Sequence, residues 1–241
     1  MTRTLTVVWP DPRPFVARDG APIRLLAVSD APDPALDYVA NRDAIGRIDA
    51  VVGCGDLEPG YLGFLGDAFR VPVAYVRGNH DRGGQWAEAA GAAPQHLRSG
   101  HLVDLDGITV APFEWPGLDP GTARRDETRA WLDVIWLSRA LVARRLRGRS
   151  APVLVVSHAP PRGVGDCDSD PYHVGFAGYR WLLDRIRPPL WLHGHTTPAS
   201  VLDWRDRLGP SVVVNVTGSV VVELDPPGST PSRAGAEADD V

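Results

Sequence analysis

The chain has 241 residues, of which 44% are hydrophobic and 23% are charged. This balance is ordinary for a soluble globular protein with a sizeable core, so it excludes general disorder. The formal net charge of −5 gives no basic field that would attract nucleic acid. No signal-peptide core or run of about 18 apolar residues occurs, and two cysteines, Cys54 and Cys167, are too few for a disulfide framework. We therefore expect a cytoplasmic protein with no nucleic-acid or membrane partner.

Short apolar runs that are rich in β-branched residues and end in turn residues predict buried strands. In chain order they are Leu5 to Trp9, Ile23 to Val28, Ala50 to Val52, Val71 to Val76, Ile108 to Ala111, Val153 to Val156, Leu190 to His193, Val212 to Val216 and Val220 to Leu224. The last two flank Thr217-Gly218-Ser219 and predict a closing antiparallel pair. We expect a mixed sheet.

Three segments between these runs have helical spacing. Residues 34–45 predict a helix begun by Asp33 as N-cap, and residues 126–147 predict a longer one with an Arg-rich last turn. A third, residues 179–186, is ended by the prolines that follow it. No linker interrupts the chain, so we expect one domain over residues 1–225. Residues 226–241 are rich in Pro, Gly, Ser and acidic residues and predict a disordered tail.

Polar residues that can bind metal follow the ends of successive predicted strands. They are Asp30, Asp56, the pair Asn79-His80, His158 and, after a fifth strand, His193 and His195. Because strand ends in an open α/β sheet converge on one crevice, these side chains are predicted to form one site. Taken singly, each has a plainer interpretation as a turn residue, a helix cap or a packed core histidine.

The ordered motifs resemble those of the calcineurin-like metallophosphoesterases. They read Asp30-Ala31-Pro32, Gly55-Asp56, Gly78-Asn79-His80-Asp81, Ser157-His158-Ala159-Pro160 and Gly194-His195-Thr196-Thr197. The resemblance covers roughly residues 23–224. It implies an α/β fold, specifically a four-layer α/β/β/α sandwich with mixed β-sheets. It also implies a hydrolase that cleaves phosphate esters, with a weak preference for a small phosphodiester, by attack of metal-bound hydroxide on phosphorus.

The same resemblance implies roles for individual residues. Asp56 would bridge two divalent cations, with Asp30 on the first metal, and Asn79, His158 and His195 would complete the second. His80 would protonate the leaving oxygen or stabilise charge, and Asp81 would orient its ring. Oxygen and imidazole ligands without a thiolate suit Mn²⁺, Fe, Zn²⁺ or Ni²⁺.

Two positions depart from the family pattern. Pro32 and Thr197 stand where the first metal normally has histidines. The first site is therefore expected to be weak, and one metal to be held firmly. Asp33 could substitute as a ligand, but this competes with its role as helix cap.

Three further residues, His173, His193 and Thr197, are candidates for contact with substrate or for support of the metal ligands. The substrate is expected to be a small phosphorylated molecule. Two other functions stay open. One is a degenerate family member that binds phosphate or a nucleotide without turnover. The other is a scaffold that uses exposed tryptophans from the set Trp9, Trp86, Trp115 and Trp204 as anchors.

Overall fold

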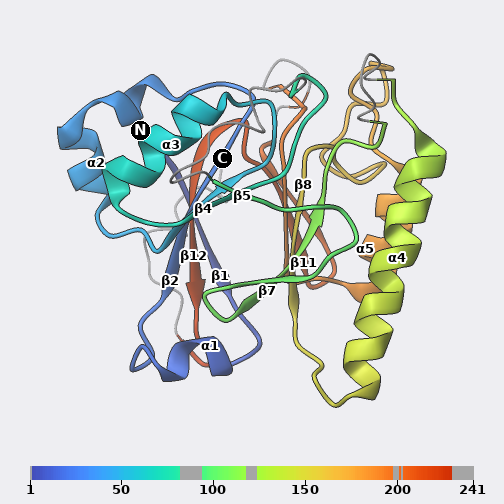
Figure 1. Ribbon diagram of the computed structural model, residues 1–241, viewed down its shortest axis with the longest axis horizontal. Coiled ribbons are helices and arrows are strands. Elements are labelled where there is room, and N and C mark those ends of the chain that lie inside the picture. The colour runs from blue at the N-terminus through green and yellow to red at the C-terminus, as the bar shows by residue number, and fades with distance from the viewer. Residues whose placement is uncertain (1, 82–93, 118–123, 198–200, 202, 230–241) are drawn as a thin grey trace.

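The computed structural model describes residues 2–81, 94–117, 124–197, 201 and 203–229. Within these residues the chain forms two six-stranded mixed sheets that pack face to face, with helices on both outer faces (Figure 1). This is the predicted four-layer α/β/β/α arrangement. No helix of the described part of the chain is long and apolar enough to cross a membrane.

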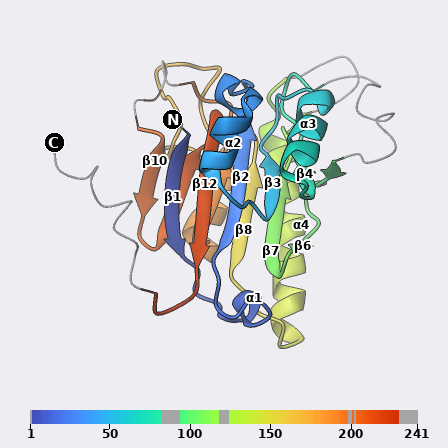
Figure 2. The same ribbon diagram turned by 90° about the vertical axis from the view of Figure 1, so that its left-hand side faces the viewer.

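The first sheet has the strand order β1-β12-β2-β3-β4-β5. Its strands are β1 (Arg3–Val8), β12 (Gly218–Asp225), β2 (Ile23–Ser29), β3 (Ala50–Gly53), β4 (Val73–Tyr75) and β5 (Gln95–His96). β12 is parallel to β1 and antiparallel to β2, and the remaining pairs are parallel. Figure 2 shows this sheet with two helices in front of it.

The second sheet has the order β10-β11-β9-β8-β7-β6. Its strands are β10 (Arg205–Leu208), β11 (Ser211–Asn215), β9 (Leu190–His193), β8 (Val153–Ser157), β7 (Ile108–Phe113) and β6 (Val103–Leu105). The two outermost pairs are antiparallel and the three inner pairs are parallel. The inner strands therefore end together at one edge of the sheet.

The helices of the described residues are α1 (Arg13–Val16), the 3₁₀ helix η1 (Pro34–Asp37), α2 (Val39–Ile45), α3 (Pro59–Phe69), α4 (Glu127–Leu146) and α5 (Ala177–Ile186). α1 lies at one end of the two sheets, where Phe15 is buried in the core between them (Figure 1). α2 and α3 lie outside the first sheet, whereas α4 and α5 lie outside the second (Figure 1). The side chain of Asp126 caps α4 by accepting from the Arg129 N–H at 2.9 Å, which agrees with the predicted start of this helix.

Three hydrophobic cores fill the spaces between the four layers. In β2, Leu25 and Ala27 face the core between the sheets, while Leu26 and Val28 face the helices outside the first sheet. β8 divides its side chains in the same way between the central core and the core under α4 and α5. Both faces of these strands are buried, which is why they read as continuous apolar runs instead of alternating ones.

Two predictions about elements were wrong. The closing antiparallel pair does not form, because β11 is parallel to β9 in the second sheet and β12 lies in the first. The chain crosses between the sheets at Thr217 and Gly218, where Gly218 has a φ of 84°. The expected helix over residues 34–45 divides at Tyr38, whose φ of −92° and ψ of 126° are extended. α1, α3, β5, β6 and β10 were not predicted.

Part of the predicted disordered tail can be compared with the structure. Residues 226–229 are described, and the Ser229 N–H donates to the Pro226 carbonyl at 3.3 Å in a turn. Residues 230–241 lie outside the described residues.

Candidate metal centre and active site

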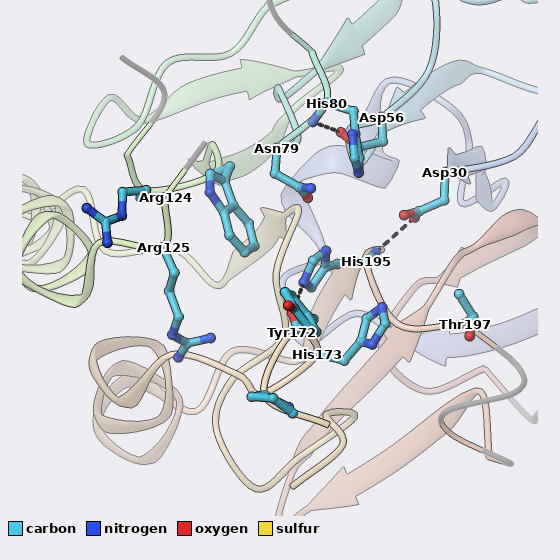
Figure 3. A pocket seen from close by; sticks show the side chains of 12 residues that line it. Asp30, Asp56, Asn79, His80, Arg124, Arg125, Tyr172, His173, His195 and Thr197 are labelled. Atoms are coloured by element: carbon cyan, nitrogen blue, oxygen red, sulfur yellow. Dashed lines mark hydrogen bonds between the residues drawn. The ribbon is translucent and has the colours of Figure 1, made fainter. Parts of the chain in front are cut away.

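A pocket of about 780 Å³ lies where the ends of strands from both sheets meet. Its lining is formed by Asp30, Asp56, Asn79, His80, Trp115, Arg124, Arg125, Pro171, Tyr172, His173, His195 and Thr197. Figure 3 shows Asp30 and Asp56 on one side of this pocket, with Arg124 and Arg125 on the other. The predicted convergence of strand ends therefore brings most of the candidate residues to one place.

Three of them form a group that could hold a metal ion. One ligand atom each from Asp30, Asp56 and His158 lies within 4.8 Å of the other two. The His158 Nε2 is also 2.9 Å from the Asn79 Oδ1 and 3.2 Å from the Asp56 Oδ2. Carboxylate, amide and imidazole donors in one cluster suit a divalent transition metal, so the residues present fit the cation that the resemblance implies.

The buried ring of His158 is oriented from behind by a backbone group. Its Nδ1 is 2.8 Å from the carbonyl oxygen of Cys54, which directs Nε2 into the site. A second hydrogen bond of this kind fixes the tautomer and orientation of metal-binding histidines in general. Burial alone would lower the pKa of His158, but the hydrogen bond and charge of Asp56 outweigh it and raise this pKa to about 9. The negative charge of Asp56 therefore favours positive charge at this point of the site.

Asp56 is fixed through both its side chain and its backbone. Its Oδ1 accepts from the His80 N–H at 2.8 Å, and its own N–H donates to the Asp81 Oδ2 at 2.7 Å. The same Asp81 oxygen accepts from the Gly78 N–H at 2.7 Å. Burial raises the pKa of Asp81, and these two amides oppose that shift. Asp81 therefore anchors the backbone that carries the metal-binding residues. Its predicted role in orienting the His80 ring stays a prediction.

Glycines allow the ligand side chains to approach the backbone. A Cβ on Gly78 would overlap the carboxylate of Asp56, and a Cβ on Gly194 would overlap that of Asp30. The two motifs therefore need glycine for steric reasons, which agrees with a site assembled from close-packed loops.

Asp30 is connected to the opposite sheet. Its Oδ2 accepts from the His195 N–H at 2.9 Å and from the Thr217 hydroxyl at 3.2 Å. The first of these bonds is drawn in Figure 3. Asp30 thus links the loop after β2 to the loop after β9, in addition to its place in the three-residue group.

The ring of His195 faces a loop carbonyl. Its Nε2 is 2.7 Å from the Tyr172 carbonyl oxygen, and its centroid is 4.7 Å from Trp115 and 5.0 Å from His158. Burial lowers the pKa of His195 to about 3, so its ring is neutral. His195 borders the pocket, but it is not in the group with Asp30, Asp56 and His158. Its role as a ligand stays a prediction.

Of the residues expected near the first metal, some line the pocket and others do not. Thr197 lines the pocket, whereas Pro32 does not. Asp33 accepts from the Ala35 N–H at 2.9 Å as the cap of η1, and its other oxygen accepts from the Ser219 hydroxyl. Asp33 is therefore engaged in the fold and is not in the metal-binding group.

Two further histidines have separate environments. His173 lines the pocket, with its ring 5.1 Å from His195 and its Nδ1 2.6 Å from the Asp170 Oδ2. His193 is fully buried behind the site, where its Nδ1 is 2.9 Å from the Gly194 carbonyl oxygen. Burial lowers the pKa of His193 to about 4. This is the packed core histidine that sequence reasoning allowed, and it does not line the pocket.

Sequence analysis did not assign Trp115, Arg124 or Arg125 to the pocket that they line. The guanidinium of Arg125 donates to the carbonyls of Val174 and Gly175 and lies 4.1 Å from the Phe176 ring centroid. It thereby joins the start of α4 to the loop that carries His173. The adjacent arginines before the predicted helix at residue 126 were the available signal.

The tryptophans named above as possible anchors are not exposed where the structure describes them. Trp9 and Trp115 are buried, at 1% and 5% exposure, and Trp204 is partly buried against the central core. Trp86 lies outside the described residues.

Comparison with known proteins agrees with this fold. A sequence model of the calcineurin-like phosphoesterases matches residues 36–198, so the chain belongs to this family of metal-dependent phosphoesterases. The match contains Asp56, Asn79, His158 and His195 but begins after Asp30. The predicted family and fold are confirmed.

Solved structures show the same fold at low sequence identity. The crystal structure of TT1561 of Thermus thermophilus aligns with a TM-score of 0.56 at 20% identity, covering 82% of this chain and 90% of that one. A second crystal structure aligns with a TM-score of 0.52 at 15% identity, covering 82% and 91%. No curated protein sequence matches the chain significantly.

Proposed function

We propose that this protein hydrolyses a small phosphate ester, with a preference for a small phosphodiester, and that it uses one firmly held divalent metal. The observation that carries the proposal is the group of Asp30, Asp56 and His158, in which Asn79 contacts His158. Asp30, Asp56 and Asn79 of this cluster line a 780 Å³ pocket. Pockets of this size hold small organic ligands.

Asp56, Asn79, His158 and His195 would hold the metal. When bound, a divalent cation would acidify the attacking water and neutralise phosphoryl oxygens. Mn²⁺, Fe, Zn²⁺ and Ni²⁺ all suit these donors, and we propose Mn²⁺ as the first to test. For Asn79 and His158, the 2.9 Å contact already places the donor atoms together.

His80 is the proposed acid. Its ring borders the pocket beside Asp56, as Figure 3 shows, while its N–H holds the Asp56 carboxylate. From this place it can donate a proton to the leaving oxygen. Asp81 supports the step indirectly, because it fixes the backbone of Asp56 and Gly78.

A diester is supported by the unequal walls of the pocket. The carboxylates lie on one side, and Trp115, Pro171 and Tyr172 give other parts of the lining an apolar character that a second ester group can contact. Both cysteines are free, which supports a reducing cytoplasm as the proposed location.

A second candidate function has its own support. Pro32 and Thr197 remove two imidazoles that the first metal site would use. A protein with this loss could bind a phosphate or nucleotide without turnover. The retention of His80 in the pocket favours the hydrolase, because simple binding needs no acid.

The test compares hydrolysis of bis-p-nitrophenyl phosphate and p-nitrophenyl phosphate with Mn²⁺ and with chelator. His158→Ala should lose turnover by at least about 100-fold, because the cation loses a ligand. The matched control is His101→Ala, since His101 is an exposed histidine outside the pocket. Absence of turnover with any divalent metal, in wild-type protein that still binds metal, would refute the hydrolase and favour the binding function.

A further inference from the structure

A second pocket, of about 550 Å³, lies at the opposite end of the second sheet. It opens between the last turns of α4 and α5, and its floor includes Thr109 and Val153 near the first residues of β7 and β8. His158 lies beyond the other end of β8, so the five residues of this strand separate the pocket from the metal centre by about 17 Å. The two pockets share no lining residue.

All charged side chains in the described lining of this second pocket are basic. Its described lining contains four arginines, Arg144, Arg145, Arg185 and Arg187, and no acidic residue. Arg144 is half-buried, and its Nη2 donates to the hydroxyl of the buried Thr109 at 3.3 Å. One guanidinium is therefore fixed near the floor, with its remaining N–H groups available to an acceptor.

Helix dipoles do not account for this concentration of charge. Basic residues are favoured at helix C-termini, where each helix carries roughly −0.5 of an elementary charge. Two such ends contribute about −1, against four guanidinium groups. An excess of positive charge therefore remains around the pocket, although the formal charge of the whole chain is −5.

The remaining walls are apolar. Leu141, Ile186, Pro188 and Trp181 line the pocket, and the Arg185 guanidinium lies 5.5 Å from the Trp181 ring centroid. Trp181 is 40% exposed, so a ligand can reach its ring. A concave apolar wall with a few convergent polar groups is typical of small-molecule sites.

We infer that this pocket binds a small amphipathic organic anion, one whose carboxylate, sulfonate or phosphate group contacts Arg144 and Arg185 while an aromatic or branched body packs on Trp181 and Leu141. The site is distinct from the metal centre and does not depend on the proposed hydrolysis.

The test uses 8-anilinonaphthalene-1-sulfonate, an aromatic sulfonate whose fluorescence rises on binding. Titration of chelator-treated protein should show one site. Arg144→Gln and Arg185→Gln should each weaken binding about fivefold, because each removes a charge-assisted contact. Arg139→Gln is the matched control, since Arg139 lies on α4 outside the pocket lining, and it should bind the dye as wild type does.

Two further measurements test whether binding depends on the anionic group and whether it depends on the metal centre. The neutral analogue N-phenyl-1-naphthylamine should bind at least about tenfold more weakly, because it lacks the anionic group. Equal binding of the two dyes would refute the anion specificity. His158→Ala should bind the sulfonate normally, so failure of the proposed hydrolysis would leave this result unchanged.

Two results together would overturn the inference. Both arginine variants would bind the sulfonate dye as tightly as wild type does, and inorganic phosphate with Mn²⁺ would displace the dye from wild-type protein. That outcome would place the dye in the active-site pocket. Arg185 is exposed, so its variant tests the inference even if Arg144→Gln fails to fold.

Discussion

Replacement of Asp81 by alanine tests how the metal ligands are supported. The Asp81 side chain is buried, at 6% exposure, and one of its oxygens accepts from the Asp56 and Gly78 N–H groups, both at 2.7 Å. Asp81→Ala would leave two amides without their acceptor, at a cost of about 3 kcal/mol for two charge-assisted bonds in a partly hydrated setting. In a chain of this length that loss lowers the melting temperature by about 6–12 °C.

Removal of the Asp81 carboxylate should also weaken metal binding. Asp81→Ala is expected to weaken Mn²⁺ binding by at least about tenfold, as removal of a group that orients a ligand does elsewhere. Asp81→Asn keeps a carbonyl oxygen for the two amides and should lower the melting temperature by only about 2–4 °C. Calorimetric titration with Mn²⁺ and thermal melting measure both effects. Asp43→Ala, at an exposed position, serves as the control. If Asp81→Ala kept its stability and metal affinity but lost turnover, Asp81 would act on the His80 ring and the anchoring role would be wrong.

Three other predictions address the metal site and the fold. Thr197→His should raise bound Mn²⁺ from one to two equivalents per chain, measured by elemental analysis, because it returns an imidazole to the side of the pocket near Asp30; an unchanged count would contradict the weak first site. Gly78→Ala should abolish tight Mn²⁺ binding in equilibrium dialysis, since its Cβ would overlap the Asp56 carboxylate, and normal affinity would refute that steric reason. Asp49→Asn should destabilise the protein by about 2 kcal/mol at neutral pH. Burial alone would raise the pKa of Asp49, but a hydrogen bond from the Arg24 N–H and the charges of Arg18 and Arg47 outweigh burial, so the net pKa is lowered. Because the pKa of Asp49 is lower in the folded state than its value of about 4 in the unfolded state, the ionised carboxylate stabilises the fold above pH 4. This stabilisation is lost as the pH falls through the pKa of the folded state. The melting temperatures of wild type and Asp49→Asn should therefore converge in acid.

The central strands could be predicted from the sequence, but their pairing could not. Residues 212–216 and 220–224 are both continuous apolar runs, because each strand is buried on two faces. Such runs carry no alternation that would assign them to one sheet or the other. The crossing at Gly218 resembles a hairpin turn locally, and only the pairing of β11 with β9 and of β12 with β2 shows otherwise. Short elements such as β5, with two residues, have too little pattern to be detected.

The candidate site was predictable where it depends on strand ends. Asp30 and His158 follow directly after β2 and β8, and Asp56 comes three residues after the end of β3. Their convergence therefore follows from the order of the strands. The orientation of His195 was not predictable, because its Nε2 is held by the carbonyl of Tyr172, which lies 23 residues earlier in a loop. Asp81 accepts from the backbone of Asp56 as well as of Gly78, and the Asp56 partner comes from tertiary structure that a four-residue motif does not contain.

Backbone strain connects the loops of this site into one unit. Asp30, Asp56 and His195 have φ values of 62°, 57° and 68°, a left-handed conformation that costs residues with a Cβ on the order of 1 kcal/mol or more each. The N–H of each is held by a neighbouring loop: Asp30 donates to the Gly55 carbonyl, Asp56 to Asp81, and His195 to the Asp30 carboxylate. The strained turns at Asp30 and His195 are therefore each stabilised by another strained turn, and the turn at Asp56 is stabilised by Asp81. Asp30 consequently holds His195 in place even where Pro32 and Thr197 leave the first metal with few ligands, which gives this carboxylate a structural role that is independent of a second metal ion.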